Sequence, residues 1–303
     1  MAELPVKPPP SVDSWPIESW QGPLPELDVL MPGSVDEALE MATAHPEASY
    51  LAGGTYLVRF GRWGPQIPTT LIHLGRLSGL RSIESRDGDV FVGGLAVHRQ
   101  IEREPALGGA RVLREAAAEI SGPAVRNLAT IGGNIVIDWD LVPALLALDA
   151  RLSVRAPGGD RTVPLDGFHA ADGTPDLAAG ALIDGVALDT SLPSQAYGKV
   201  ARRAAASRAI VGVGVALSTS DGTCTEARIG IGGSALTSRR LTDAEEALRG
   251  ATLDDSAFDA AAEAAYEACD DARDDMEASA WYVRDMTRVM TKRTVRRAAA
   301  ASR

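Results

Sequence analysis

The chain has 303 residues, of which 45% are hydrophobic and 23% charged, which allows one large or two medium globular domains. The formal net charge of −11 argues against a nucleic-acid-binding protein and favours solubility. No apolar run is long enough to span a bilayer, and the N-terminal residues lack the apolar stretch of a signal peptide.

The two cysteines and four histidines show no metal-binding pattern. Cys224 and Cys269 form no CxxC pair, and the histidines lack the spacing of a metal site. The chain therefore provides no cysteine-ligated iron–sulfur or zinc site of its own. A reducing, cytoplasmic compartment fits this cysteine usage. The motifs GxSxG and GxxxxGK are also absent, which argues against a hydrolase elbow and a P-loop.

Short strands and helices are expected to alternate through the first part of the chain. Residues 1–25 are rich in proline, serine and tryptophan and form a predicted N-terminal arm. Ser34 and Glu37 have capping-box spacing, so a helix is expected to run from there to about Ala44. Residues 50–52 and 69–74 are the next predicted strands.

Hairpins and helices complete the first predicted domain. Asp87-Gly88 lies between two apolar runs and predicts a hairpin, and Gly158-Gly159 predicts another. Residues 143–148 form an apolar helix with Pro143 in its first turn. Residues 26–190 are therefore expected to form one α+β domain. Further helices are expected from residue 98 and over residues 111–120.

A second domain is predicted over residues 191–303. The alternation of valine and glycine over residues 211–215 indicates close backbone packing on one face of a strand. The basic residues near the C-terminus predict a solvated helix face, with a docking surface as the alternative. The predicted strands are residues 197–203, 210–218 and 225–232, and the predicted helices are residues 242–249, 255–271 and 276–300.

Two glycine loops of similar composition are the main functional signal. The first glycine loop reads Leu51-Ala52-Gly53-Gly54-Thr55-Tyr56-Leu57, and the second reads Arg126-Asn127-Leu128-Ala129-Thr130-Ile131-Gly132-Gly133-Asn134. Glycine permits a positive φ and close approach to a ligand, and successive amides in such a turn form an anion site. Two such loops can grip a diphosphate from two sides. The alternative is that each is an ordinary turn between strands.

Two charged residues outside the loops are candidates for ligand contacts. Lys199 lies on the strand that enters the second domain, where a cation can stabilise negative charge on a reduced ring system; the alternative is a surface lysine. A carboxylate is repelled by a diphosphate, so Asp140 would bind hydroxyl groups; the alternative is a helix N-terminal charge before Pro143. The GxGxxA match at residues 230–235 precedes helices rather than a βαβ unit, so no Rossmann site is predicted.

These motifs, in this order, resemble the FAD-binding medium subunits of the molybdenum hydroxylases, the group of CO dehydrogenase and xanthine dehydrogenase. The family's AGGTDL loop is similar to residues 52–57, and its RNxATIGGN loop to residues 126–134. Its DLxPALLALDA segment is similar to residues 140–150, and its KxxRRA pattern to residues 199–204. The resemblance covers about residues 26–300.

The resemblance implies an α+β fold and a cofactor. Residues 26–190 would form a two-lobed FAD-binding domain of the PCMH type, which is vanillyl-alcohol-oxidase-like. A three-stranded antiparallel sheet with a helix bundle would follow over residues 191–303. The loops would hold the diphosphate and ribityl chain, Asp140 the ribityl hydroxyls, Ile183 the ring and Lys199 its pyrimidine edge. The implied cofactor-binding residues are Leu51, Ala52, Gly53, Gly54, Thr55, Tyr56, Leu57, Thr130, Ile131, Gly132, Gly133, Asn134, Asp140, Ile183 and Lys199.

The resemblance also implies a function. The chain would be the FAD-binding subunit of a molybdenum-containing hydroxylase, passing electrons from a small [2Fe-2S] subunit to an external acceptor. A large molybdopterin subunit would carry the molybdenum cofactor, in a cytoplasmic dimer of heterotrimers. The alternatives are a stand-alone PCMH-type FAD oxidoreductase and a structural bridging subunit that has lost FAD. The chain departs from the family pattern at Tyr56, at His73 and in the shorter segment 135–142.

Overall fold

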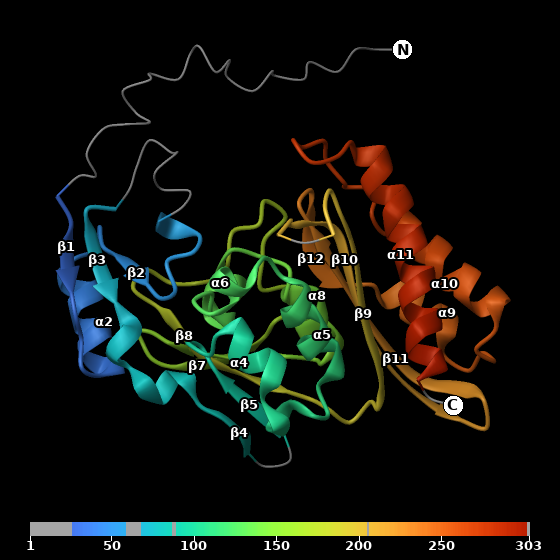
Figure 1. Ribbon diagram of the computed structural model, residues 1–303, viewed down its shortest axis with the longest axis horizontal. Coiled ribbons are helices and arrows are strands. Elements are labelled where there is room, and N and C mark those ends of the chain that lie inside the picture. Colours follow the sequence, from blue (N-terminus) through green and yellow to red (C-terminus); the bar gives the residue numbers. More distant parts are fainter. Residues whose placement is uncertain (1–25, 59–67, 87–88, 205, 302–303) are drawn as a thin grey trace, which may run out of the picture.

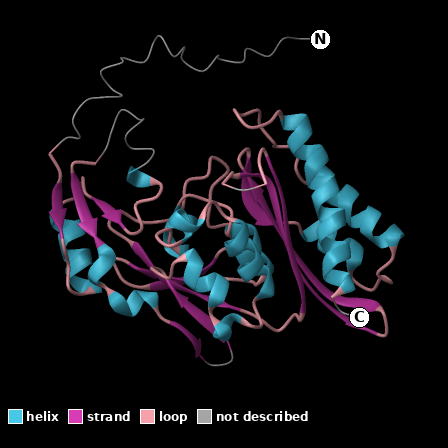
Figure 2. Cartoon of the chain, in the orientation of Figure 1, coloured by secondary structure: helices cyan, strands magenta, loops and turns pink. Residues whose placement is uncertain are grey.

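The computed structural model describes residues 26–58, 68–86, 89–204 and 206–301, so the predicted arm and the Asp87-Gly88 turn lie outside the described residues. Three sheets follow one another across the molecule, with helices between and beside them (Figures 1 and 2). A small lobe lies at one end, a helix-rich lobe in the middle, and a sheet backed by three helices at the other end (Figure 1).

The first lobe is a parallel sheet in the order β1-β3-β2, with α2 packed against it. The Ser34 hydroxyl caps α2 by accepting a hydrogen bond from the Glu37 amide at 3.1 Å, as the capping-box spacing predicts. The Glu37 carboxylate accepts a bond from the Gly33 amide at 2.6 Å rather than from that of Ser34. The elements are β1 (Asp28–Leu30), α2 (Val35–Ala44), β2 (Ser49–Leu51) and β3 (Thr70–His73).

The second lobe is an antiparallel sheet in the order β4-β5-β8-β6-β7, and its helices bury a common apolar core against that sheet. Both predicted hairpins are confirmed, because β4 pairs with β5 and β6 with β7. The strands are β4 (Ile83–Arg86), β5 (Asp89–Gly93), β6 (Arg151–Arg155), β7 (Arg161–Pro164) and β8 (Leu182–Leu188), and the helices are α4 (His98–Arg103), α5 (Arg111–Glu119), α6 (Pro123–Arg126), α7 (Ile131–Val136) and α8 (Val142–Ala147).

The third sheet contains four antiparallel strands in the order β12-β11-β10-β9, so the prediction of three strands was one short. β11 continues to Gly233, reverses through Ser234-Ala235 and pairs with the short strand β12. The GxGxxA match is therefore a strand end and a turn, as expected. The elements are β9 (Ser194–Ala201), β10 (Ala209–Ser220), β11 (Thr223–Gly233), β12 (Leu236–Arg240), α9 (Thr242–Leu248), α10 (Asp255–Glu267) and α11 (Ala280–Ala300).

Glycines on β10 and β11 form the contact between this sheet and α8. A Cβ placed on Gly214 would lie 2.4 Å from the Pro143 carbonyl oxygen, and one on Gly230 would lie 2.2 Å from the same atom. The close backbone packing predicted from the valine–glycine alternation is thus confirmed. Because α8 lies directly on the sheet, the segment that precedes it is held at the boundary between the two predicted domains.

The basic C-terminal stretch is largely paired within the chain. Lys292 and Arg296 of α11 form ion pairs with Asp259 and Asp255, which both lie in α10. Arg297 donates a hydrogen bond to the Tyr197 carbonyl at 2.7 Å and so ties α11 to β9. Helices α9 to α11 thus cover the sheet face opposite α8 (Figure 1). Among the described residues, no helix has the length and apolar character needed to cross a membrane.

Candidate functional site

The two glycine loops lie directly against each other. A Cβ placed on Gly53 would lie 1.9 Å from the Leu128 carbonyl oxygen and 3.2 Å from the Ala129 Cα. The first loop begins at the last residue of β2 and the second runs into the first turn of α7, so the contact joins the two lobes of the first predicted domain. The loops therefore border one shared site rather than two unrelated surfaces.

The loops use their glycines in different ways. Gly54 has a φ of +67°, the left-handed conformation that glycine adopts readily. Gly132 and Gly133 instead lie in the first turn of α7, where the Thr130 hydroxyl caps the helix by accepting from the Gly133 amide at 3.2 Å. The expectation of a positive-φ turn therefore holds for Gly54 and is wrong for Gly132 and Gly133.

Close backbone approach is what requires glycine at position 132. A Cβ there would lie 2.7 Å from the Gly94 carbonyl oxygen, to which the Gly132 amide donates a hydrogen bond of 2.9 Å. The Ile131 amide donates to the Ala96 carbonyl at 2.9 Å. These amides are committed to the chain's own acceptors, so the second loop provides no row of free amides like that expected for an anion-binding turn.

A third glycine pair, Gly93-Gly94, completes this part of the site and was missed in the sequence. A Cβ on Gly94 would lie 2.2 Å from the Ile183 carbonyl oxygen, and the Gly94 amide donates to the Asp184 carbonyl at 2.7 Å. Gly132, Gly94 and Ile183 therefore form consecutive backbone layers. The signal was present in the sequence, because Gly93-Gly94 is another Gly-Gly pair at the end of an apolar run.

Asp140 and Lys199 form a buried ion pair across the domain boundary. The Lys199 Nζ lies 3.6 Å from the Asp140 Oδ2, and the two side chains are only 6% and 3% exposed. The Asp140 carboxylate also accepts from the Ala209 amide at 3.1 Å, and Lys199 donates to the Glu119 carbonyl at 2.8 Å. The alternative predictions, that Lys199 is a surface lysine and that Asp140 is a helix N-terminal charge, are therefore wrong.

Burial governs the electrostatics of this pair. Loss of solvation raises the pKa of Asp140, and the Lys199 ammonium and the Ala209 amide offset part of that rise. The adjacent Tyr197 is fully buried and donates to the Asp140 carbonyl at 3.2 Å. Burial and the nearby carboxylates raise the pKa of its phenol, so Tyr197 acts as a neutral donor. The geometry thus concentrates one cation and one carboxyl group in a water-poor region.

A cluster of three side chains, which we call the aromatic clasp, consists of Tyr56, Trp139 and Arg208. The Tyr56 and Trp139 rings meet edge to face with centroids 5.6 Å apart, and the Arg208 guanidinium lies 4.0 Å from the Trp139 ring centroid. Trp139 and Arg208 also border a crevice that is too narrow to hold a water molecule. Sequence reasoning identified neither Trp139 nor Arg208, although a tryptophan beside Asp140 was a visible signal.

The remaining candidate residues surround these contacts. Leu51 ends β2, and its side chain lies 3.3 Å from a Cβ placed on Gly54. The Asn134 side chain is buried and accepts from the Leu141 amide at 2.9 Å, so it shapes the segment before α8. The Ile131 and Ile183 side chains lie in the core beneath the second loop. Ala52, Thr55 and Leu57 are half-buried in the first glycine loop.

The site has apolar surface that fits the ring system of a ligand. Tyr56, Val58 and Leu128 are large apolar residues exposed beside the glycine loops, at 42%, 49% and 57%. In the crevice, the buried atoms Asp138 Oδ1 and Arg208 Nε have no hydrogen-bond partner among the described residues. Exposed apolar surface beside the loops is unfavourable unless a partner or ligand covers it, whereas the unpaired atoms lie in a crevice too narrow for a ligand to enter. The ring system of a flavin dinucleotide fits the exposed apolar surface of Tyr56, Val58 and Leu128.

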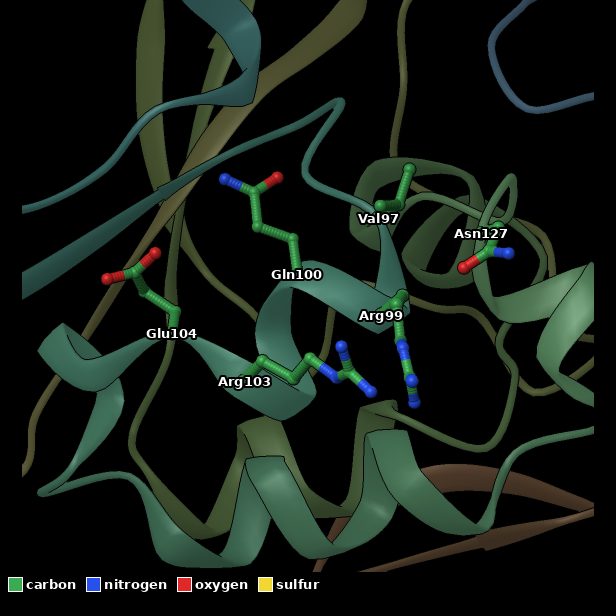
Figure 3. Close-up of a pocket in the computed structure, with 6 residues that line it drawn as sticks. All are labelled: Val97, Arg99, Gln100, Arg103, Glu104 and Asn127. Atoms are coloured by element: carbon green, nitrogen blue, oxygen red, sulfur yellow. The ribbon is translucent and has the colours of Figure 1, made fainter.

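A separate open pocket of about 450 Å³ lies on the α4 side of the second loop (Figure 3). The Arg99 and Arg103 side chains point to one side of α4, whereas Gln100 and Glu104 point elsewhere (Figure 3). Arg99 is bound to Glu102 at 2.9 Å. Because its polar groups do not converge on one point, we place the candidate site at the loop contact instead.

Comparisons with known proteins show the family and the fold of this chain. Residues 25–190 match the family described as "FAD binding domain in molybdopterin dehydrogenase", and residues 195–298 match the family described as "CO dehydrogenase flavoprotein C-terminal domain". The chain is 30% identical to the 6-hydroxypseudooxynicotine dehydrogenase complex subunit alpha of Paenarthrobacter nicotinovorans, covering 90% of this chain and 95% of that one. It is 29% identical to the nicotine 6-hydroxylase medium subunit of the same organism, covering 78% and 85%. Carbon monoxide dehydrogenase from Hydrogenophaga pseudoflava has a similar structure, with a TM-score of 0.87, 30% identity, and coverage of 91% of this chain and 98% of that one.

Proposed function

The chain belongs to the family of FAD-binding medium subunits of molybdenum hydroxylases, and from this premise we propose how its residues hold FAD. The observation that carries the proposal is the contact of Gly53 with Leu128, which brings two distant glycine loops to one site. The residues proposed to hold FAD are those of the two loops, Leu51 to Leu57 and Thr130 to Asn134, together with Asp140, Ile183 and Lys199.

The protein's contribution is to bind, orient and shield the cofactor. When bound, FAD supplies an electron carrier for an oxidoreductase complex. The first glycine loop offers the left-handed Gly54 turn for a close backbone contact. Asp140 can accept hydrogen bonds from hydroxyl groups, and Lys199 can stabilise negative charge beside it. The packed glycine layers beneath the second loop keep solvent away from this side of the site.

We further propose that the chain works in a complex. The relatives include medium and alpha subunits, which by their names belong to larger assemblies. A small [2Fe-2S] subunit would deliver electrons, and a large molybdopterin subunit would carry out substrate hydroxylation. We propose a cytoplasmic dimer of heterotrimers, with residues 26–190 as the FAD-binding domain and residues 191–303 as the domain that closes over Asp140. The domain limits are supported by the family matches to residues 25–190 and 195–298.

Purification and spectroscopy test the proposal. The full chain is produced alone and together with the neighbouring reading frames, and each preparation is examined for flavin absorption. Acid extraction and chromatography then identify the released cofactor. We expect FAD at one per chain, with a [2Fe-2S] chain and a large molybdopterin chain in the co-produced sample. A colourless protein in both preparations would support the bridging-subunit alternative, and a yellow protein that associates with neither partner would support the stand-alone oxidoreductase.

A further inference from the structure

The aromatic clasp joins three parts of the chain that are far apart in sequence. Tyr56 belongs to the first glycine loop, Trp139 follows the second loop, and Arg208 lies just before β10. The first glycine loop, the segment before α8 and the second domain therefore meet at a single side chain, Trp139.

The backbone around Trp139 is held from both sides. Asp138 has a φ of +48°, a left-handed conformation that aspartate tolerates better than most residues with a side chain. The Asp138 carboxylate accepts from the Ser238 amide at 2.9 Å, and the Asp140 carboxylate accepts from the Ala209 amide. Both acidic side chains thus anchor the segment to the second domain, while Trp139 between them contacts the first glycine loop.

We propose that Trp139 is a positioning residue for FAD. Through Tyr56 it fixes the first glycine loop relative to Asp140 and Lys199, at the separation that the bound cofactor requires. Arg208, stacked on the Trp139 ring, holds the indole in place from the second domain. This inference rests on the proposed FAD-binding function, because the clasp positions two sets of residues that are assigned to the same ligand.

The proposal makes aromatic character at position 139 the property that matters. A phenylalanine keeps a ring that can meet Tyr56 edge-on and stack under Arg208, whereas a leucine keeps apolar volume without a ring. We therefore expect Trp139→Leu to raise the Kd for FAD about tenfold, from the loss of two ring contacts. We expect the Kd of Trp139→Phe for FAD to stay within about threefold of the wild-type value, because the conservative change keeps both ring contacts.

The test uses the full chain, in its complex if FAD is retained only there. FAD affinity is measured by titration, and the visible circular dichroism of bound FAD reports its orientation. Trp281→Leu is the matched control, because Trp281 lies on α11 and is 69% exposed. The proposal expects a weakened Kd and a changed dichroism band for Trp139→Leu, and wild-type values for Trp281→Leu. If Trp139→Leu lowers the unfolding midpoint but leaves the Kd for FAD and the dichroism at their wild-type values, Trp139 has only a structural role and the proposal is overturned.

A second variant keeps the test decisive if Trp139→Leu does not fold. Arg208 is not among the residues proposed to hold FAD, so Arg208→Leu removes the guanidinium from the Trp139 ring and is expected to weaken FAD binding as well. Wild-type affinity and dichroism in both leucine variants would overturn the clasp while leaving FAD binding intact. Absence of FAD from the wild-type protein in every preparation would instead overturn the proposed function itself.

Discussion

Replacing Gly53 by alanine tests the contact on which the site depends. The added methyl carbon would lie 1.9 Å from the Leu128 carbonyl oxygen and 2.7 Å from the Leu128 carbonyl carbon. Both are backbone atoms, so no flexible side chain can move aside. Widening the first distance to 3.0 Å needs a displacement of 1.1 Å, and that displacement must separate the two glycine loops.

The size of the effect follows from this displacement. Overpacking at a site that cannot relax costs roughly 1–3 kcal/mol of stability. A misplacement of about 1 Å in a catalytic site can lower the reaction rate about a hundredfold, and we expect ligand affinity to fall by up to the same factor. We therefore expect Gly53→Ala to lower FAD affinity about ten- to a hundredfold, which corresponds to roughly 1.4–2.7 kcal/mol of binding free energy.

Equilibrium titration with FAD, together with urea unfolding, measures both effects. Gly122→Ala is the matched control, because Gly122 lies four residues before the second loop and a Cβ there has no neighbour within 4 Å. Its φ of −94° also suits alanine. If Gly53→Ala binds FAD within twofold of both wild type and Gly122→Ala, the two loops do not grip one ligand and the reasoning is refuted.

Three further predictions concern buried groups. Lys199→Met leaves the Asp140 carboxyl buried without its cation and should destabilise the protein by roughly 3 kcal/mol in urea unfolding; adding Asp140→Asn should restore much of this loss. Burial lowers the pKa of His98 to about 4. The contribution of the neutral imidazole to the free energy of unfolding is therefore complete above about pH 6.5 and falls by roughly 3 kcal/mol as the pH drops towards 4. His98→Leu should flatten the curve of stability against pH over this range. Gly230→Ala should cost roughly 1–3 kcal/mol against the open-space control Gly158→Ala, and equal melting temperatures for the two would contradict the packing of α8 on the sheet.

Local signals in the sequence predict much of the fold. The Ser34 cap, the hairpin partners of β5 and β6, and Pro143 at the start of α8 each depend on residues within a few positions of one another. The fourth strand of the third sheet, β12, has no such local signal. Its sequence, Leu-Thr-Ser-Arg-Arg, has little apolar alternation, and pairing with β11 supplies its structure.

Sequence reasoning locates the glycine loops but cannot tell how each glycine is used. A glycine required for a positive φ, as at Gly54, and one required for close backbone approach, as at Gly132, look the same in the sequence. The distinction depends on what lies opposite, and for Gly132 that is the Gly94 carbonyl from a different strand end. The same limit applies to Asp140 and Lys199, whose ion pair forms only when β9 packs beside the segment before α8.

The segment 135–142 shows how one large side chain can span the boundary between two domains. In this chain a large side chain occupies that boundary, because Trp139 reaches Tyr56 on one side and Arg208 on the other. The acidic residues on either side of it stay anchored to the second domain through the Ser238 and Ala209 amides. One side chain therefore links the first glycine loop to the second domain, and Tyr56 supplies the ring that it meets edge to face.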